Sequence, residues 1–473
     1  MIKSRIRFNL RFKIIGEIVG RASALLLYAF GARLLGSDRF GLFSLAYSYA
    51  FLFIVLIDLG SNNIITREIA RNRELTLKQL PALNSLKLVL IPVMLLLIHV
   101  FVAFMSKDPG VIRLAHLMGW LAVGTALGEY QSALLSGVEK MDIEAKLKMG
   151  WKLGSFALAV IFFQLFKSLE SFIAGMAIGQ WISVCVGFVW IDRNLAPLRF
   201  SLDFSPLKPL AKSCLPLTVG WAFTSLYVNQ PVLILSWLGL SHQNIGQYAG
   251  SAKLIDALRP VPVLLMSALF PILSEASINN KPLFFKMIGA IYSHSVLLLL
   301  PFTLIASLLS RPLSVLVFGA EFVQTGHVFF VAVWGFSLIF LNHIFAQILL
   351  SADGQRKLMV GSIVVTFLNA LFCLLFIPRY GIVGGGWALV LGELGLSAFN
   401  IFFLRSLFKG QHETLVSDFV RPTFFLLITG LLFFLSNEWI GAGGGFGIAL
   451  AFVAFVTYKF KLLDVSLLQK LRS

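Results

Sequence analysis

Long apolar stretches recur along almost the whole chain, and short polar segments separate them. A transmembrane helix needs about 20 mostly apolar residues, and about fourteen stretches meet this requirement. The predicted spans are 14–34, 42–64, 81–105, 111–137, 151–167, 170–191, 213–238, 249–274, 285–309, 326–350, 358–377, 383–405, 420–437 and 443–459. The pattern therefore predicts an all-α polytopic membrane protein whose polar chemistry lies among its helices.

One predicted span, Ala249 to Ser274, contains three ionisable side chains. Lys253, Asp256 and Arg259 are spaced three apart, so they fall within one third of a helix's circumference. A single face can therefore point all three at a wet interior instead of lipid. A cationic face inside a membrane favours an anionic ligand.

Three prolines follow on the same span, Pro260, Pro262 and Pro271. Proline removes a helix hydrogen bond and bends the helix. The prolines predict either a hinge that carries Arg259 between two exposures or a static kink.

Composition supports the membrane class, because 58% of the 473 residues are hydrophobic and only 13% are charged. The formal charge of +17, from 39 Lys and Arg against 22 Asp and Glu, would suggest nucleic acid in a soluble protein. Cytoplasmic loops of membrane proteins are basic, however, and most Lys and Arg fall on the side of the N-terminus. The asymmetry predicts an even number of spans with both termini in the cytoplasm and no nucleic-acid partner.

Cofactor and metal signals are lacking in the sequence. Cys185, Cys214 and Cys373 lie in or beside apolar stretches without metal-ligand spacing, so they resemble small buried hydrophobes. Gly384-Gly385-Gly386 opens a predicted membrane helix without the lysine that a phosphate loop needs. No metal, no cofactor and no direct use of ATP are expected.

An internal repeat relates the two halves of the chain. Leu35-Gly36 and Phe40-Gly41 match Leu238-Gly239 and Ile245-Gly246, and Tyr130 to Ser136 matches Phe345 to Ser351. Six spans separate the matched segments, so both halves enter the membrane in the same sense, as parallel repeats do. The predicted domains are an N-terminal six-helix bundle at 1–195, a C-terminal bundle at 196–410, and two further helices with a basic tail at 411–473.

Several short motifs resemble one known family. They are Leu34-Leu35-Gly36 with Phe40-Gly41-Leu42, Asp58-Leu59-Gly60, Thr66 to Ala70, Ala268 to Ser274, Phe318-Gly319, and Pro378 to Gly384 with Trp387-Ala388 and Glu393. In this order they resemble the polysaccharide and O-antigen flippases of the multidrug/oligosaccharidyl-lipid/polysaccharide (MOP) exporter superfamily. The run Gly384-Gly385-Gly386 departs from the family, which usually has other small residues there.

The resemblance implies a fold and a function. The expected fold is two parallel six-helix bundles in a V around a central cavity, with two helices appended. The expected substrate is an oligosaccharide on a polyprenyl-pyrophosphate carrier, translocated by alternating access across the cytoplasmic (inner) membrane for O-antigen, capsule or exopolysaccharide assembly. The lipid bilayer and the lipid-linked glycan are expected partners, and a polysaccharide polymerase is a further candidate.

Four cations inside the spans are candidates for binding the pyrophosphate, since Arg engages phosphate oxygens in pairs and Lys acts as a point charge. They are Arg259, Lys253, Arg21 and Lys87. Each has a structural alternative. Lys253 is able to snorkel or pair with Asp256, Arg21 is able to pair with Glu17, and Lys87 near the end of its span is expected to be an interfacial anchor.

Carboxylates inside the spans are candidates for coupling transport to a proton or sodium gradient, because their charge state biases one conformation. The candidates are Glu129, Glu393, Asp256 and Asp58. For Asp58 the favoured alternative is an ion pair with Arg67 or Arg71. The mixed-charge segment from Gly137 to Gly150 is interpreted as a solvated cytoplasmic face.

Two other functions remain open. A drug or cation exporter of the same superfamily needs an acidic cavity, whereas the cations inside the spans favour an anion. A membrane glycan polymerase or glycosyltransferase is the third alternative, but such enzymes have a large external loop or an acidic metal-binding pair, and the predicted external loops are short. A non-enzymatic transporter is therefore expected.

Overall fold

The computed structural model describes residues 2–351, 355–404 and 416–459, although not the side chains of some stretches, residues 2–24 among them. The helices are α1 (Ile2–Phe51), α2 (Val55–Asp58), α3 (Ser61–Arg71), α4 (Arg73–Met105), α5 (Pro109–Gly137), α6 (Met141–Phe166), α7 (Leu169–Asn194), η1 (Ser205–Leu207), α8 (Lys208–Trp237), α9 (His242–Leu258), α10 (Pro260–Asn279), α11 (Lys281–Leu308), α12 (Ser310–Phe318), η2 (Ala320–Phe322), α13 (Val323–Ser351), α14 (Gln355–Tyr380), α15 (Ile382–Leu404), η3 (Val416–Val420) and α17 (Arg421–Lys459). The described residues form no strand.

Ten of the described helical stretches are long and apolar enough to cross a membrane, or eleven if the bent pair in α9 and α10 is one span. The predicted class, an all-α polytopic membrane protein, is confirmed. This number is lower than the fourteen predicted spans, in part because the single stretch Leu25–Arg71 holds two of them. Gly36, with φ 75° and ψ 168°, interrupts α1 between these two spans.

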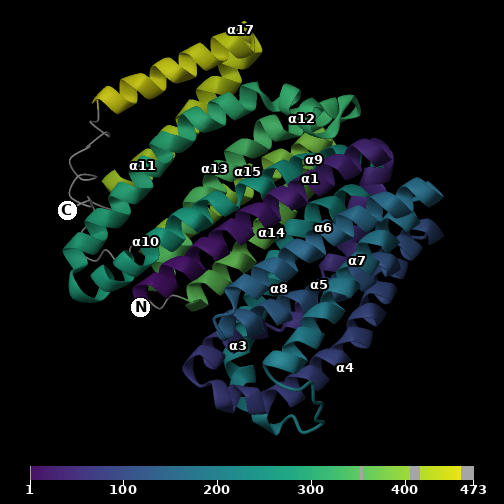
Figure 1. Cartoon of the computed structure of the whole chain (residues 1–473). Helices are drawn as coiled ribbons and strands as arrows, with labels where there is room; N and C mark the ends of the chain where they lie inside the picture. Colours follow the sequence, from purple (N-terminus) through teal and green to yellow (C-terminus); the bar gives the residue numbers. More distant parts are fainter. Residues whose placement is uncertain (1, 352–354, 405–415, 460–473) are drawn as a thin grey trace. The chain divides into compact units, whose positions relative to one another are not determined.

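The chain divides into two compact units, residues 1–249 and 250–473. In unit 1, α4, α5, α6 and α7 run alongside one another (Figure 1), with α7 packed on both α5 and α6. In unit 2, α15 packs on both α13 and α14, and α11 on α13 and α17. Unit 1 includes α8 because this helix packs on α1, α2 and α3. The predicted boundary at residue 195 remains a prediction about the repeat.

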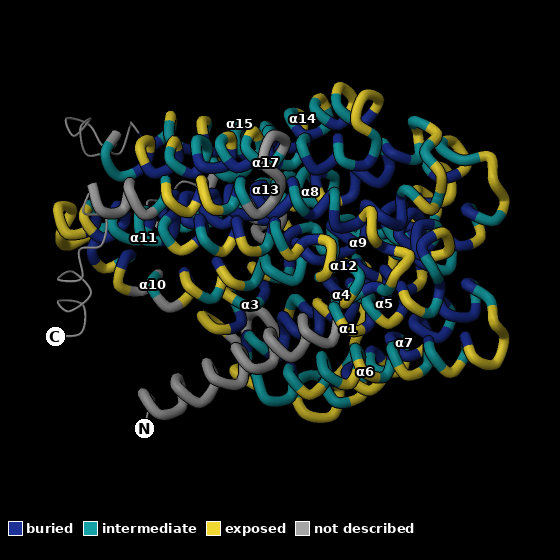
Figure 2. The backbone as a smooth tube through the Cα atoms, turned by 90° about the horizontal axis from the view of Figure 1, so that it is seen from above, coloured by how far each residue is buried: buried dark blue, intermediate teal, exposed yellow. Residues whose placement is uncertain are grey.

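Burial follows the roles expected of membrane helices (Figure 2). In unit 2, α13 is the most enclosed described span, with Phe336, Phe340 and Phe345 each at most 2% exposed. By contrast, α14 exposes Phe367, Leu371 and Leu375. Apolar side chains on the outside of a membrane protein face lipid at no cost. The exposed apolar faces are therefore assigned to lipid.

Backbone geometry supports the internal repeat. Gly36 and Gly239, the glycines matched by sequence, both have positive φ, at 75° and 78°. Each ends the first span of its half, where only glycine adopts the left-handed region without strain.

Two further matched glycines, Gly41 and Gly246, contact each other inside unit 1. A Cβ on Gly41 would lie 1.8 Å from the carbonyl oxygen of His242, and a Cβ on Gly246 would lie 2.0 Å from that of Ser37. Each partner carbonyl belongs to the residue four positions before the other glycine, so the contact is reciprocal. Two equivalent helix starts thus cross at their glycines, as small residues allow in membrane helices.

The second span of each half is interrupted. In the first half, turns follow Phe51 and Asp58, and Leu59 and Gly60 both adopt left-handed conformations, with φ of 48° and 64°. In the second half, α9 ends at Leu258 and α10 begins at Pro260. An interrupted helix exposes backbone polar groups that need partners within the protein. The candidate charges lie at both breaks.

Candidate functional site

Lys253 and Asp256 of α9 and Arg259, the N-cap residue of α10, form one charged group in unit 2. The Asp256 carboxylate lies between two cations, with Oδ2 3.6 Å from Lys253 Nζ and Oδ1 3.1 Å from Arg259 Nε. All three side chains are partly exposed, at 17% for Lys253, 37% for Asp256 and 30% for Arg259. The shared helix face predicted from their spacing is confirmed, and so is the pairing of Lys253 with Asp256. Two cations thus share the Asp256 carboxylate.

The prolines after Arg259 have different surroundings. Pro260 and Pro262 lie in the first turn of α10, where an N–H has no helical partner, so proline is tolerated there. Pro271 lies between the segments His242–Ser267 and Ile272–Asn279, whose axes differ by 46°. The side chain of Pro271 is outside the described residues. A bend is present on this span, and its role as a hinge remains a prediction.

Lys87 on α4 is buried in unit 1, at 3% exposure. Its ammonium donates to the Ile57 carbonyl oxygen at 2.9 Å and to Ser61 Oγ at 3.1 Å, and it lies 4.6 Å from the centre of the Tyr130 ring. The prediction of an interfacial anchor is therefore wrong. The break between α2 and α3 leaves a carbonyl without a helical partner, and Lys87 supplies the missing donor.

Asp58 lies at the same break. Its Oδ1 accepts a hydrogen bond from the backbone N–H of Asn62 at 3.2 Å, in the first turn of α3. Arg67 and Arg71, its predicted partners, instead lie 3.2 Å and 3.7 Å from Glu68. The carboxylate thus caps a helix start, which explains the position of this residue before Gly60. The side chain of Arg21 is outside the described residues.

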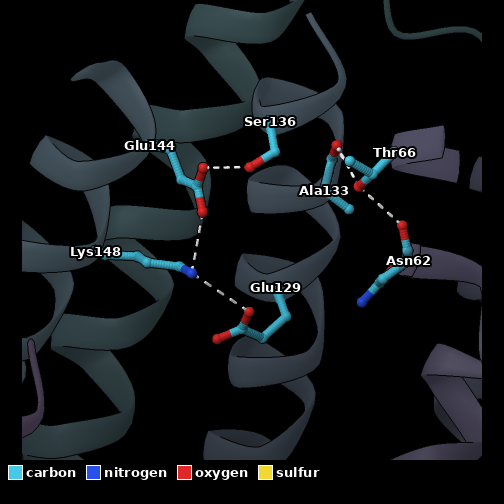
Figure 3. Close-up of polar contacts among 7 residues, drawn as sticks. All are labelled: Asn62, Thr66, Glu129, Ala133, Ser136, Glu144 and Lys148. Atoms are coloured by element: carbon cyan, nitrogen blue, oxygen red, sulfur yellow. Dashed lines mark hydrogen bonds and ion pairs between the residues drawn. The ribbon is translucent and has the colours of Figure 1, made fainter. Parts of the chain in front are cut away.

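Glu129 belongs to a charged group between α5 and α6 (Figure 3). Lys148 Nζ lies 3.1 Å from Glu144 Oε1 and 3.8 Å from Glu129 Oε2. The other oxygen of Glu144 accepts a hydrogen bond from Ser136 on α5. Glu144 is 8% exposed, so the interpretation of residues 137–150 as a solvated face is wrong for the part that begins α6.

Glu129 faces away from the lipid side of α5. Trp120 on this helix is 48% exposed and borders an apolar groove with Trp181 and Ile182 of α7, which marks the lipid side. Nine residues at 100° each place Glu129 about 180° around the helix from Trp120. The side chain of Glu129 is nevertheless 48% exposed. Its exposed part therefore lies on the side of α5 opposite Trp120.

Glu393 on α15 is buried in unit 2, at 4% exposure. Asn342 Nδ2 on α13 donates to Glu393 Oε2 at 2.8 Å and to its carbonyl oxygen at 2.9 Å. Asn342 Oδ1 in turn lies 3.0 Å from Ser397 Oγ and accepts from Asn400 Nδ2 at 3.2 Å. A carboxylate surrounded by amides and a hydroxyl is a site where protonation changes the local charge.

The structure separates the candidates into four groups. Lys253, Asp256 and Arg259 come together on α9 and α10, and Lys87 and Asp58 come together at the α2–α3 break. Glu129 and Glu393 lie in separate polar groups of different units. Glu144, Lys148 and Asn342 are further members of these groups that were not predicted from the sequence. The spacing of Glu144 and Lys148, four apart on one helix face, was the available signal.

The described residues contain no cluster of three or more His, Cys, Asp and Glu side chains that could hold a metal ion.

Comparison with protein families gives two matches. Residues 9–277 match a family described as polysaccharide biosynthesis protein. Residues 258–453 match a family described as the lipid II flippase MurJ. No curated protein matches the sequence.

Solved structures share the fold over most of the chain. Lipid II flippase MurJ in an inward closed conformation has a TM-score of 0.61 and 14% identity, over 96% of this chain and 99% of that one. An inward-facing multidrug resistance MATE family transporter of the MOP superfamily has the same TM-score and identity, over 85% of this chain and 99% of that one. A MOP superfamily transporter from Pyrococcus furiosus, whose binding pocket is described as having reverse polarity, has a TM-score of 0.55 and 15% identity, over 83% of this chain and 95% of that one.

The first family match covers more than half of the chain, and the architecture is that of MurJ and the MATE transporters. The protein is thus a multi-pass membrane protein with the fold of the MOP superfamily, and it belongs to the polysaccharide biosynthesis protein family.

Proposed function

We propose that the protein is a flippase that moves polyprenyl-pyrophosphate-linked oligosaccharides from the cytoplasmic to the external leaflet of the inner membrane. Neither a pyrophosphate nor a glycan crosses hydrocarbon unaided, because both would lose their hydrogen bonds to water. The family match to polysaccharide biosynthesis proteins and the structural likeness to the lipid II flippase MurJ support this class of substrate.

The observation that carries the proposal is the charged group of α9 and α10. Lys253 and Arg259 flank the Asp256 carboxylate, and all three side chains are partly exposed just before the start of α10 at Pro260. Cations that remain accessible at bilayer depth are expensive unless they serve an anion. The guanidinium of Arg259 suits a phosphate, since it presents parallel donors in one plane.

Arg259→Ala tests the proposal in cells that display the glycan at their surface. A hydrogen bond to a charged group contributes about 1.5–3 kcal/mol, so transport should fall by about 10- to 100-fold. Arg259→Lys should retain part of the activity because it keeps the charge. Arg379→Ala, which removes an exposed arginine of the same unit, is the matched control. Normal glycan display by Arg259→Ala at equal protein level would contradict the proposal.

Ion coupling is proposed for the buried Glu393. Its contact with Asn342 holds the carboxylate between two spans, so its charge state bears on how α13 and α15 pack. Glu393→Gln keeps the shape and removes the titration. In vesicles with a defined pH or sodium gradient, this variant should transport at a rate that no longer depends on the gradient. A rate that follows the gradient as in the wild type would exclude Glu393.

The proposed orientation places both termini in the cytoplasm, as the distribution of Lys and Arg favours. In this orientation, the crossing of Gly41 with Gly246 lies toward the external face. A polysaccharide polymerase that consumes the flipped lipid-linked glycan is the proposed protein partner. The protein itself is proposed to leave the glycan chemically unchanged, which mass spectrometry of the substrate after incubation with purified protein would check.

A further inference from the structure

The linker between α7 and α8, residues 195–207, is fastened to unit 1 at both ends. Leu195 and Ala196 pack against a buried apolar cluster that includes Leu83 and Tyr130. Leu207 belongs to the same cluster and is 7% exposed. The chain between these two ends is therefore held against the surface of the unit.

Hydrogen bonds fasten the middle of the linker to α4. The N–H of Ser201 donates to the Pro81 carbonyl oxygen at 3.2 Å and to Ser85 Oγ at 2.9 Å. Asn84 Nδ2 donates to the carbonyl oxygen of Arg199 at 3.2 Å. These contacts use the backbone of the linker and leave its side chains to other partners.

The linker turns three large apolar side chains outward. Phe200 is 62% exposed, Leu202 is 82% exposed and Phe204 is 39% exposed. They occupy alternate positions, and Ser201 between the first two lies against α4. We call these three side chains the apolar edge of the linker. A group of exposed apolar side chains of this kind marks a surface that binds a partner.

The position of the apolar edge on unit 1 indicates lipid as this partner. Asn84 and Ser85 of α4 hold the linker. One turn later on the same face of α4, Leu88 and Val89 are 58% and 51% exposed, and the exposed apolar surface that begins there faces lipid. The linker thus crosses α4 where its lipid-facing surface begins.

The charged side chains of this region differ in their contacts. Asp192 Oδ1 accepts a hydrogen bond from the N–H of Leu198 at 2.6 Å, and Asp203 Oδ1 accepts one from the N–H two residues later at 2.9 Å. Both carboxylates therefore bind the linker backbone. Arg193 and Arg199 are exposed. Exposed arginines beside exposed apolar side chains suit an anionic headgroup and the acyl chains below it.

We propose that the α7–α8 linker binds anionic phospholipids of the leaflet on its own side of the membrane. The apolar edge lies among the upper parts of the acyl chains, and Arg193 and Arg199 contact the phosphate groups. Arginine suits this place because its stem packs on apolar groups while its planar head bonds phosphate oxygens in pairs. In the proposed orientation this is the cytoplasmic leaflet. The inference does not depend on which substrate the protein transports.

A spin label measures the depth of the apolar edge in lipid. Leu202→Cys carries a nitroxide in the full-length protein, whose three native cysteines are replaced, in vesicles of phosphatidylcholine and phosphatidylglycerol. Collisions with oxygen, which concentrates among acyl chains, should exceed collisions with a water-soluble nickel complex. Glu139→Cys, an exposed position between α5 and α6 on the same side of the membrane, is the matched control and should show the reverse.

The lipid composition tests the anionic headgroup. The label at Leu202 should lie deeper with phosphatidylglycerol present than in phosphatidylcholine alone, because each arginine near an anionic surface should raise the population of the inserted linker by about fivefold. Arg193→Gln combined with Arg199→Gln should remove this response. Both side chains are exposed, so the variant should fold. Arg113→Gln, an exposed arginine near the opposite end of α5 from Glu139, should keep the response.

Two results would overturn the proposal. A label at Leu202 that meets the nickel complex as often as the label at Glu139 would place the apolar edge in water and leave it to a protein partner. A response to phosphatidylglycerol that survives in the double arginine variant would show that these arginines do not bind the headgroups. Neither result bears on the flippase proposal, which the glycan display of Arg259→Ala tests separately.

Discussion

Lys87 shows how a cation inside a span serves the fold. Its ammonium meets the Ile57 carbonyl oxygen, the Ser61 hydroxyl and the Tyr130 ring, so it joins α4 to the break between α2 and α3 and to α5. Lys87→Met should leave a buried carbonyl without a donor, at a cost of about 1–3 kcal/mol. Thermal unfolding of the purified protein should show a lower Tm. Lys78→Met, an exposed lysine of the same helix, should leave Tm unchanged. An unchanged Tm for Lys87→Met together with lost transport would instead indicate a binding role.

Prediction from sequence succeeds for single residues whose partners are close along the chain. The spacing of Lys253, Asp256 and Arg259 was enough to expect one shared face, because a regular helix fixes it. The partners of Lys87 lie on other helices, and depth along a span does not reveal them. Asn342 and Glu393 likewise lie on different helices, so their contact forms only in the folded unit and is not visible in the sequence.

The crossing of α1 and α9 depends on its two glycines. A Cβ at either position would lie 2.0 Å or less from a carbonyl oxygen, so the helices must separate to accept it. Gly41→Ala and Gly246→Ala should each destabilise the protein by about 1–3 kcal/mol, as overpacking does. Gly154→Ala, in α6 where nothing lies within 4 Å, is the matched control and should be neutral or stabilising. Thermal unfolding measures all three.

The double variant Gly41→Ala with Gly246→Ala tests whether the two contacts form one unit. Once the first Cβ has separated the helices, the second has little left to disturb, so the cost should be smaller than the sum of the single costs. Full additivity would show that the crossing does not hold the two helix starts together.

At the scale of elements, the length of the apolar stretches predicts the helices. The places where helices are interrupted depend on single residues and their contacts. Gly36 and Gly239 were found as repeat positions, and their positive φ agrees with helix ends. The left-handed Leu59 has no sequence signal, since leucine rarely adopts this conformation, and the contacts of the neighbouring Gly60 with α8 come from a distant part of the chain.

The whole molecule carries a testable membrane orientation. With both termini inside, Lys107 between α4 and α5 faces outward, and Glu139 between α5 and α6 faces the cytoplasm. In a background without Cys185, Cys214 and Cys373, Lys107→Cys should react with an impermeant maleimide in intact cells. Glu139→Cys should react only after the cells are permeabilised. The opposite pattern would invert the orientation and the proposed direction of transport.

The reciprocal contact of Gly41 with Gly246 also limits which residues the two matched segments are able to accept. At an ordinary helix contact, a larger residue on one side is offset by a smaller one opposite. No such compensation exists here, since neither glycine has a side chain to give up. A side chain at either glycine therefore disturbs both helix starts.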